Sequence, residues 1–248
     1  MALKGRLRRW LTGFRVAIAL FGFPGASGSE LTAEPTLGPD PTSVVGQMRR
    51  AYERINDYEA VFIKQARFDE KLSREETIQF CFRKPFMVYM NWIKDPHKGR
   101  EVAYVEGENE NKLRAHERGM LSFVVVSLDP KSPRAMEGSH HPITDAGIGK
   151  LIELMASQVK RATEREELIW RSLGCWEFDG RPTYKLEAVF PENRDAGYYC
   201  YRAVLWIDCE LVLPVQVMIY DWDNNLYEKF AYRKLRTNVG IPNSRFNL

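Results

Sequence analysis

The four histidines are the side chains of this chain that are best suited to catalysis or metal binding. They are His97, His116, His140 and His141, in a chain of 248 residues that also has 33 acidic residues. Imidazole and carboxylate groups are common zinc ligands and common general bases. One function class that the sequence leaves open is therefore a metal-dependent or other hydrolase that uses these four histidines.

The spacing of the histidines does not favour a shared site. His140 and His141 are adjacent, and on an extended segment neighbouring side chains point in opposite directions, which is poor for joint metal ligation. The chain has no Gly-x-Ser-x-Gly, His-Glu-x-x-His or glycine-rich phosphate motif, although Ser139 precedes His140. We therefore expect no enzyme, no catalytic residue, no metal site and no cofactor.

The N-terminus has the three-part layout of a secretory signal peptide. Residues 1–15 carry five basic side chains and no acidic one, residues 16–23 are uncharged and mostly apolar, and residues 26–28 are small. A membrane-spanning helix needs about 20 apolar residues, and this apolar run is far shorter. We expect residues 1–28 to be a cleaved signal peptide and the protein to be periplasmic or secreted. The pair Arg8-Arg9 leaves open whether export uses the general or the twin-arginine route.

The expected signal peptide, the leader of the chain, also accounts for the positive net charge. The chain has a net charge of +3, and the leader contributes five positive charges and no negative one, so the mature protein has a net charge of −2. A nearly neutral protein has no electrostatic basis for binding nucleic acid, and we expect no such partner. Residues 29–41 are rich in proline and predict an extended linker, after which residues 42–248 form a single domain.

The four cysteines fit an oxidising compartment without requiring disulfides. Cys81, Cys175, Cys200 and Cys209 have none of the short paired spacings of a zinc site. If residues 200–209 form one continuous strand, its two end cysteines face opposite ways about 30 Å apart and cannot pair. Two disulfide connectivities then remain, and four buried free thiols are an equal alternative.

Periodic apolar residues predict two helices and eight or more mainly antiparallel strands. The first helix begins at residue 42 or 43 and ends near 56–57. The second follows a loop over 129–142, with Thr144 as N-cap and with Ile143 and Ile148 as a hydrophobic staple. The expected strands cover residues 58–68, 77–83, 86–93, 101–106, 112–116, 121–128, 174–178, 182–190, 198–208, 213–220 and 226–235.

The strand over 86–93 is apolar on both faces, which predicts that both faces are covered. So many strands with only two sizeable helices exceed what one flat sheet can bury. We therefore expect an α+β fold in which a strongly curved antiparallel sheet forms an open, or half, β-barrel, with helices packed in its concave face. A sheet curled in this way can enclose one apolar ligand.

Short motifs carry a resemblance to known families. The segments Phe-Ile-Lys-Gln at 62–65, Phe-Arg-Lys-Pro-Phe at 82–86 and Val-Leu-Trp-Ile-Asp at 204–208, followed by Leu-Pro-Val at 213–215, resemble the bacterial periplasmic lipoprotein carriers of the LolA-like and LppX-like kind. More narrowly, Lys-Gly-Arg-Glu at 98–101 and Gly-Ser-His-His-Pro-Ile-Thr at 138–144 resemble an uncharacterised family of secreted bacterial proteins, a domain of unknown function. That narrower resemblance covers about residues 43–246.

This resemblance implies a non-catalytic carrier that holds a lipid or the acyl chains of a lipoprotein in an apolar cavity. We expect the cavity lining to be Phe80, Phe82, Val88, Met90, Trp92, Leu205 and Ile207. The residues expected at the lid or mouth are Arg83, Ile148, Leu151, Ile152 and Met155. The alternative for each lining residue is that it only packs against the helices. The implied partners are a lipid or an acylated protein.

A third function class is a protein–protein interaction module of the cell envelope. In this class the tyrosine cluster Tyr198, Tyr199 and Tyr201 is expected to be exposed and to contact the partner, because tyrosines are enriched at interfaces. The sequence leaves the oligomeric state open.

Overall fold

The computed structural model describes residues 36–37, 39–116 and 124–248. The expected signal peptide over residues 1–28 lies outside the described residues. Among the residues that are described, no helix is long and apolar enough to cross a membrane.

The first helix, α1 (Pro41–Glu53), begins as its sequence indicates. The carboxylate of Asp40 accepts a hydrogen bond of 2.6 Å from the amide of Ser43, and Pro41 occupies the first turn, where no amide donor is needed. The helix ends earlier than predicted because the last turn tightens, with the amide of Ile55 donating to the carbonyl of Tyr52. Ile55 remains buried in the core, which explains why the apolar pattern continues past the end of the helix.

The second helix, α2 (Ile148–Glu164), begins later than predicted. The expected N-cap, Thr144, lies instead in a short 3-10 turn, η2 (Ile143–Asp145), so the predicted N-cap and staple are wrong. The amide of Ile148 donates to the hydroxyl of Tyr58, 2.8 Å away on a distant strand. Gly147 precedes it with φ +102°, and a Cβ there would lie 2.7 Å from the same hydroxyl.

In the described part of the chain, thirteen strands pair in one antiparallel sheet. The strands are β1 (Thr36–Leu37), β2 (Asp57–Phe68), β3 (Lys71–Leu72), β4 (Glu76–Arg83), β5 (Met87–Trp92), β6 (Glu101–Val105), β7 (Leu113–His116), β8 (Val126–Leu128), β9 (Ile169–Phe178), β10 (Arg181–Val189), β11 (Arg202–Asp208), β12 (Pro214–Tyr220) and β13 (Leu226–Thr237). Three further 3-10 turns are η1 (Asn109–Asn111), η3 (Arg194–Ala196) and η4 (Asn243–Phe246).

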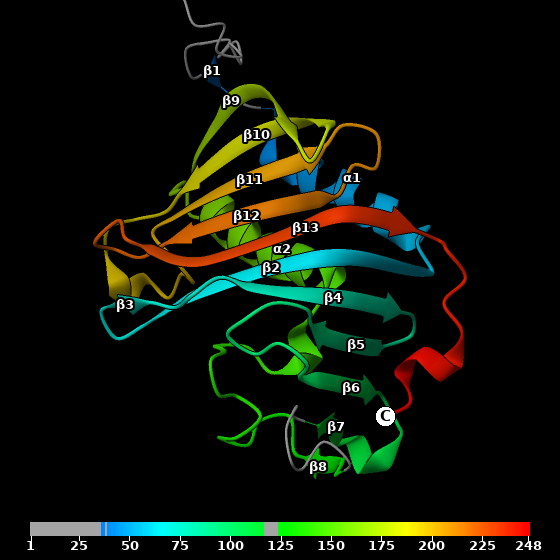
Figure 1. Ribbon diagram of the computed structural model, residues 1–248. Helices are drawn as coiled ribbons and strands as arrows, with labels where there is room; N and C mark the ends of the chain where they lie inside the picture. The colour runs from blue at the N-terminus through cyan, green and yellow to red at the C-terminus, as the bar shows by residue number, and fades with distance from the viewer. Residues whose placement is uncertain (1–35, 38, 117–123) are drawn as a thin grey trace, which may run out of the picture. The chain divides into compact units, whose positions relative to one another are not determined.

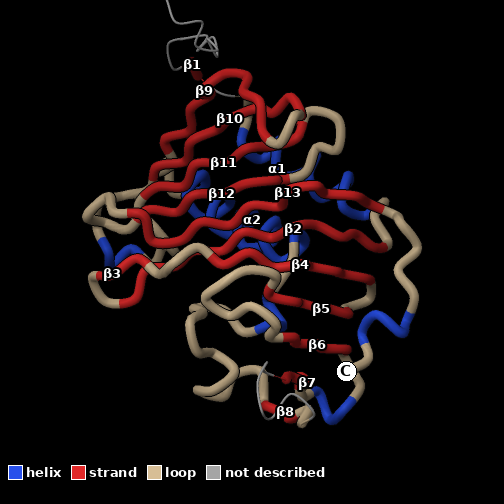
Figure 2. The backbone as a smooth tube through the Cα atoms, viewed as in Figure 1, coloured by secondary structure: helices blue, strands red, loops and turns tan. Residues whose placement is uncertain are grey.

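The order of the strands is β1-β9-β10-β11-β12-β13-β2-β4-β5-β6-β7-β8, and β3 pairs with β2 outside this row (Figure 2). The two end strands, β1 and β8, do not pair with each other, so the sheet is open. The prediction of an open, mainly antiparallel α+β fold is confirmed. Residues 36–37, within the expected linker, form β1 and pair with Ser172 and Arg171 of β9.

Both helices lie on one face of the sheet, where they contact each other (Figure 1). Their apolar side chains share one core with the side chains that the strands direct to this face. The centre of this core is aromatic, because the rings of Tyr58, Phe80 and Phe82 stack at centroid distances of 5.2–5.9 Å. The ring of Tyr232 meets that of Tyr58 edge-on. Helices and sheet are thus joined by large, fully buried side chains.

The other face of β5 is also covered, as predicted from its two apolar faces. Tyr89 on that face, together with Cys81 of the neighbouring β4, packs against Ile241 and Phe246 of the C-terminal segment. The carboxylate of Asp57 accepts hydrogen bonds from the amides of residues 239–241, which holds this segment against the sheet.

The strand predicted over 198–208 begins only at Arg202. Cys200 and Cys209 therefore do not lie on one continuous strand, and the condition that excluded a disulfide between them is not met. All four cysteines are free thiols in the structure. The turn after β11 is organised by Asp208, whose carboxylate accepts from the amides of Glu210 and Leu211 and forms an ion pair with Arg181. The strand expected over 121–128 is shorter, because β8 begins at Val126, and its residues 121–123 lie outside the described residues.

Candidate functional site

A cavity of about 470 Å³ lies on the helix side of the sheet. Strands β2, β4, β5, β6, β7, β8 and β13 supply one wall, and the first turns of α2 together with the loop over 129–142 supply the other. Apolar side chains cover much of both walls; among them are Phe62, Ile78, Met90, Val102, Leu113, Val126, Leu151 and Leu154. This combination of a sheet wall and a loop-and-helix wall makes the cavity the candidate site.

The structure divides the residues expected to line a cavity into two groups. Met90 and Trp92 line the cavity, and so does Leu151 from the expected mouth set. The residues that lie instead in the core between sheet and helices are Phe80, Phe82, Val88, Leu205 and Ile207, together with Ile148 and Ile152 of α2. Whether any of these residues contributes to ligand binding stays a prediction.

The two remaining residues expected at the mouth lie apart from the cavity. Met155 is partly buried against the core. The guanidinium of Arg83 donates to the carbonyl of Ile241 in the C-terminal segment, at 2.8 Å. Arg83 therefore contacts the C-terminal segment.

Polar groups form one part of the strand wall. The ammonium group of Lys64 on β2 donates to the carbonyl of Gly138 at 2.7 Å and lies 3.8 Å from the carboxylate of Glu76 on β4. The indole nitrogen of Trp92 donates to the other oxygen of Glu76. Burial lowers the pKa of Lys64, and the charge of Glu76 counteracts this effect. The bond from Lys64 to Gly138 also attaches the loop to the strand wall.

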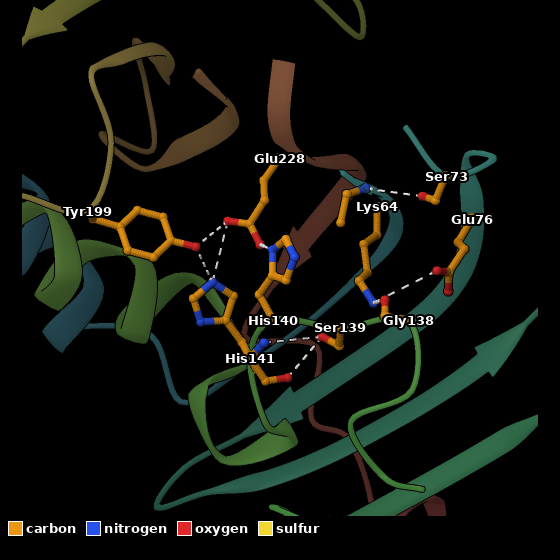
Figure 3. A network of polar contacts seen from close by, with 10 residues as sticks. Lys64, Ser73, Glu76, Gly138, Ser139, His140, His141, Tyr199 and Glu228 are labelled. Carbon is orange, nitrogen blue, oxygen red and sulfur yellow. Dashed lines mark hydrogen bonds and ion pairs between the residues drawn. The ribbon is translucent and has the colours of Figure 1, made fainter. Parts of the chain in front are cut away.

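The adjacent histidines anchor the same loop to β13 through one buried carboxylate (Figure 3). Glu228, whose side chain is only 1% exposed, has one oxygen 3.0 Å from Nδ1 of His140 and the other 3.4 Å from Nε2 of His141. The hydroxyl of Tyr199 donates to Glu228 and lies 2.7 Å from Nε2 of His141. The turn at residues 139–141 directs both rings to the same carboxylate, whereas neighbouring side chains on an extended segment would point in opposite directions.

These contacts set the ionisation of the network. Burial alone would raise the pKa of Glu228, but hydrogen bonds from His140, His141 and Tyr199 and the charge of His141 lower it to about 2. The hydrogen bond to Glu228 raises the pKa of His141 despite burial. Burial and the charge of Glu228 raise the pKa of Tyr199. Glu228 is therefore an ionised acceptor at neutral pH, and both of its oxygens are bonded to groups that it anchors.

The four histidines do not converge on one catalytic centre. His97, His116 and His141 all line the cavity, but His116 lies 3.8 Å from Glu101 on β6 and His141 is bonded to Glu228. Within the described ranges, no three His, Cys, Asp or Glu side chains form a group that could hold a metal ion. The hydroxyl of Ser139 donates to the carbonyl of His141 and is not bonded to an imidazole. The arrangement fixes a loop and presents no Ser–His pair.

The tyrosine cluster is less exposed than the interaction-module hypothesis requires. Tyr198 is buried, and its hydroxyl bonds to the carboxylate of Glu167. Tyr199 is half-buried within the Glu228 network, and Tyr201 is also half-buried. The expectation that these tyrosines are exposed is wrong.

The sequence of the chain matches a protein family whose model is described as "Protein of unknown function (DUF1571)", over residues 55–248. The chain belongs to this family. The match includes the strands β2 to β13 and α2, and therefore all the strands that line the cavity. The sequence-based expectation of membership in a domain-of-unknown-function family is confirmed. A search of the curated proteins finds no match.

Several solved structures resemble this chain at low sequence identity. The lipoprotein LppX of Mycobacterium tuberculosis is 14% identical with a TM-score of 0.48, over 82% of this chain and 97% of that chain. A chain of the Pseudomonas aeruginosa MucA/MucB complex is 13% identical with a TM-score of 0.46, over 85% and 61%. A LolA superfamily protein of Nitrosomonas europaea is 9% identical with a TM-score of 0.36, over 85% and 99%. All three TM-scores are below 0.5, so the function has to be argued from the cavity itself.

Sequence reasoning missed several of the residues that shape the cavity of this DUF1571 member. Lys64 shares the inward face of β2 with Phe62, and that alternation is a signal that could have placed it at the site. No local pattern indicated a role for Glu228, because its histidine partners, His140 and His141, are 88 and 87 residues away in the sequence. Arg100 lies in the Lys-Gly-Arg-Glu motif and lines the cavity, but the motif alone indicated no role for it.

Proposed function

We propose that this protein is a non-catalytic carrier that holds one hydrophobic ligand, a lipid or the acyl chain of a lipoprotein, in the cavity of about 470 Å³. The observation that carries the proposal is the cavity itself, with its apolar walls. Its volume lies within the roughly 300–1,000 Å³ of small-ligand sites. Each methylene group moved from water into such a site contributes about 0.8 kcal/mol, so a ten-carbon chain contributes about 7 kcal/mol before ordering costs.

In this proposal the sheet is a strongly curved half β-barrel, and α1 and α2 occupy its concave face. The shared core of the two helices and one sheet face supports this arrangement. Met90, Trp92 and Leu151 contact the ligand, while Phe80, Phe82, Val88, Leu205 and Ile207 support the wall from the core. Ile148, Ile152 and Met155 hold α2 in place at the mouth, and Arg83 secures the C-terminal segment.

The location that fits this role is the periplasm or the exterior, which the signal-peptide pattern of residues 1–28 supports. The partners are then a lipid or an acylated protein. The geometry of the described residues does not favour the hydrolase alternative. The three histidines that line the cavity, His97, His116 and His141, belong to no metal-holding group, and Ser139 does not bond to an imidazole.

The proposal is tested by narrowing the cavity. Val126 on β8 lines the cavity, whereas Val239 is 41% exposed and lies outside it. In titration calorimetry, 1-decanol is expected to bind the wild type at one molecule per chain. Val126→Phe is expected to weaken this binding about tenfold or more, because the added ring occupies ligand space.

The matched control is Val239→Phe, which adds the same ring at the surface and is expected to bind decanol like the wild type. Equal decanol affinity in all three proteins would refute the assignment of this cavity. Absence of binding of both decanol and decanoate to the wild type would refute the carrier function.

A further inference from the structure

Lys64 and Glu76 form an ion pair that is buried in the strand wall of the cavity (Figure 3). The two residues are direct partners in the register of β2 and β4, and their side chains are only 14% and 8% exposed. Each charged group is held by a neighbour, because the ammonium group donates to the carbonyl of Gly138 and the indole of Trp92 donates to Oε2 of Glu76. The pair is therefore a fixed polar feature in a largely apolar wall.

The pair keeps part of its hydrogen-bonding capacity. Nζ of Lys64 and Oε1 of Glu76 are 3.8 Å apart, which is longer than an N–H···O hydrogen bond. An ammonium group has three donors, and the bond to Gly138 uses one of them. From the described residues, Oε1 of Glu76 accepts no hydrogen bond of normal length. The wall thus presents a donor and an acceptor side by side, and both can serve a ligand.

A hydroxyl group satisfies both atoms at once. Its oxygen can lie about 2.8 Å from each of them, where it accepts from Lys64 and donates to Glu76. An ether oxygen can accept from Lys64 but has no proton to donate to Glu76. Water has the same two capacities as a hydroxyl, so a ligand hydroxyl replaces water at the pair with both bonds kept, whereas an ether loses one of them.

Charged head groups are less suitable at this pair. A carboxylate attracted by Lys64 lies beside the carboxylate of Glu76, and an ammonium group attracted by Glu76 lies beside that of Lys64. Burial lowers the pKa of Lys64, the charges of Glu76 and Glu228 raise it, and the charge of Arg100 lowers it, so charges of both signs act at this point of the wall. A ligand ion of either sign therefore meets a like charge next to its attractive partner.

An apolar row adjoins the pair on the next strands of the same wall. Met90, Val102, Ala115 and Val126 are successive register partners across β5, β6, β7 and β8, and all four line the cavity. The apolar row spans three strand spacings, about 14 Å, which is enough for an extended ten-carbon chain. Because β5 pairs with β4, the polar pair and the apolar row belong to neighbouring strands.

We propose that the ligand of this cavity is a neutral amphiphile whose hydroxyl group binds between Lys64 and Glu76 while its chain lies along the apolar row. The inference rests on the proposed carrier function and narrows its ligand to long-chain alcohols and hydroxyl-bearing lipids of the monoacylglycerol kind. The hydroxyl fixes the position of the head by two hydrogen bonds to charged groups, which are stronger than bonds between neutral groups. The apolar row supplies the burial of the chain.

The test compares 1-decanol, decyl methyl ether and decanoate by titration calorimetry at pH 7. The wild type is expected to bind decanol about tenfold or more tightly than the other two probes, because decanol alone completes both bonds at the pair. The double variant Lys64→Met/Glu76→Leu replaces both charges, so neither is left buried without its partner. In this variant decanol and the ether are expected to bind within about threefold of each other, since the apolar row remains.

The matched control is Lys229→Met/Glu75→Leu, which removes an ion pair of 2.9 Å between the same residue types, neither of which lines the cavity. It is expected to keep the full preference for decanol. Equal binding of decanol and the ether by the wild type, or tighter binding of decanoate than of decanol, would overturn the hydroxyl inference and leave the carrier function intact. Binding of none of the three probes would overturn the carrier function.

An undiminished preference for decanol in the double variant would also overturn the inference. If the double variant does not fold, Glu76→Gln decides. The indole of Trp92 donates to Oε2 of Glu76 and so orients the oxygen of the new amide towards itself, which places the amide nitrogen where Oε1 now lies. A donor then replaces the acceptor, and the preference for decanol over the ether is expected to fall about tenfold. A preference that stays at the wild-type value would contradict the hydroxyl site.

Discussion

Replacing Glu228 by glutamine is expected to lower the free energy of unfolding by about 3–5 kcal/mol, the usual cost of removing one partner from a buried charged network. The carboxylate is 1% exposed and accepts from His140, His141 and Tyr199. A glutamine side chain presents one amide donor where it now presents an acceptor, so at least one of these donors loses its partner. Urea unfolding at pH 6 measures the loss.

The matched control is Glu153→Gln, which removes a carboxylate that is 61% exposed and paired with Arg49. An exposed ion pair contributes about 0–1 kcal/mol, so this change is expected to be nearly neutral. Hydrogen exchange at residues 138–142 is expected to accelerate only in Glu228→Gln, since those residues are held by the network. Equal losses in the two variants would contradict the role of Glu228 as the loop anchor.

The effect of Glu228→Gln is also expected to depend on pH. The folded-state pKa of Glu228 is lowered from 4.5 to about 2, so its contribution of about 3 kcal/mol is present above pH 4.5 and is lost as the pH falls from 4.5 towards 2. The folded-state pKa of His141 is raised above 6.5, so its contribution is fully present below pH 6.5 and is lost as the pH rises through the raised value. The stability difference between wild type and variant should be largest between about pH 4.5 and 6.5.

Phe80→Ala is expected to lower the free energy of unfolding by about 3–5 kcal/mol, because it empties a fully buried aromatic site. The ring contacts those of Tyr58, Phe62 and Tyr232 at the centre of the core. Chemical denaturation measures the loss. Since Phe80 lies in the core and does not line the cavity, the affinity of the folded variant for decanol should stay within a fewfold of the wild type.

The control for this change is Phe86→Ala at a half-buried position after β4. Phe86→Ala removes the same side chain and is expected to lower the free energy of unfolding by less than half as much, because water already reaches that ring. A Phe80→Ala protein of normal stability, or one with strongly weakened decanol binding, would contradict the division between core and cavity residues.

Local patterns in the sequence were enough to predict most strands and the first helix. In β4 the alternation of the apolar Ile78, Phe80 and Phe82 with more polar residues was enough to predict a strand, although Thr77 and Cys81 on its other face are buried as well. The two apolar faces of β5 likewise predicted the cover that the C-terminal segment provides.

The start of α2 and the loop anchor were not predictable in this way. The amide of Ile148 is satisfied by Tyr58, 90 residues away, so the favourable local N-cap Thr144 is not used. Glu228 meets His140 across 88 residues, and no spacing pattern reveals such a contact. Both features depend on tertiary packing that brings distant segments together.

The sequence also did not indicate which residues lie in the core and which line the cavity. Phe80 and Met90 are direct neighbours across β4 and β5 and share one face of the sheet. Phe80 is fully buried in the core, yet Met90 lines the cavity. Alternation identifies the face, but the position of α2 and the loop over 129–142 decides which part of that face is filled by protein.

The most direct test of the central claim is native mass spectrometry of the wild-type protein, purified from its native cells without detergent. We expect a population whose mass exceeds that of the polypeptide by one amphiphile, and whose extra mass is released as an acyl-containing molecule on denaturation. The variant Val126→Phe, purified in the same way, should carry much less of this bound amphiphile. A wild-type protein that shows only the polypeptide mass, both as purified and after incubation with decanoate, would contradict the carrier function.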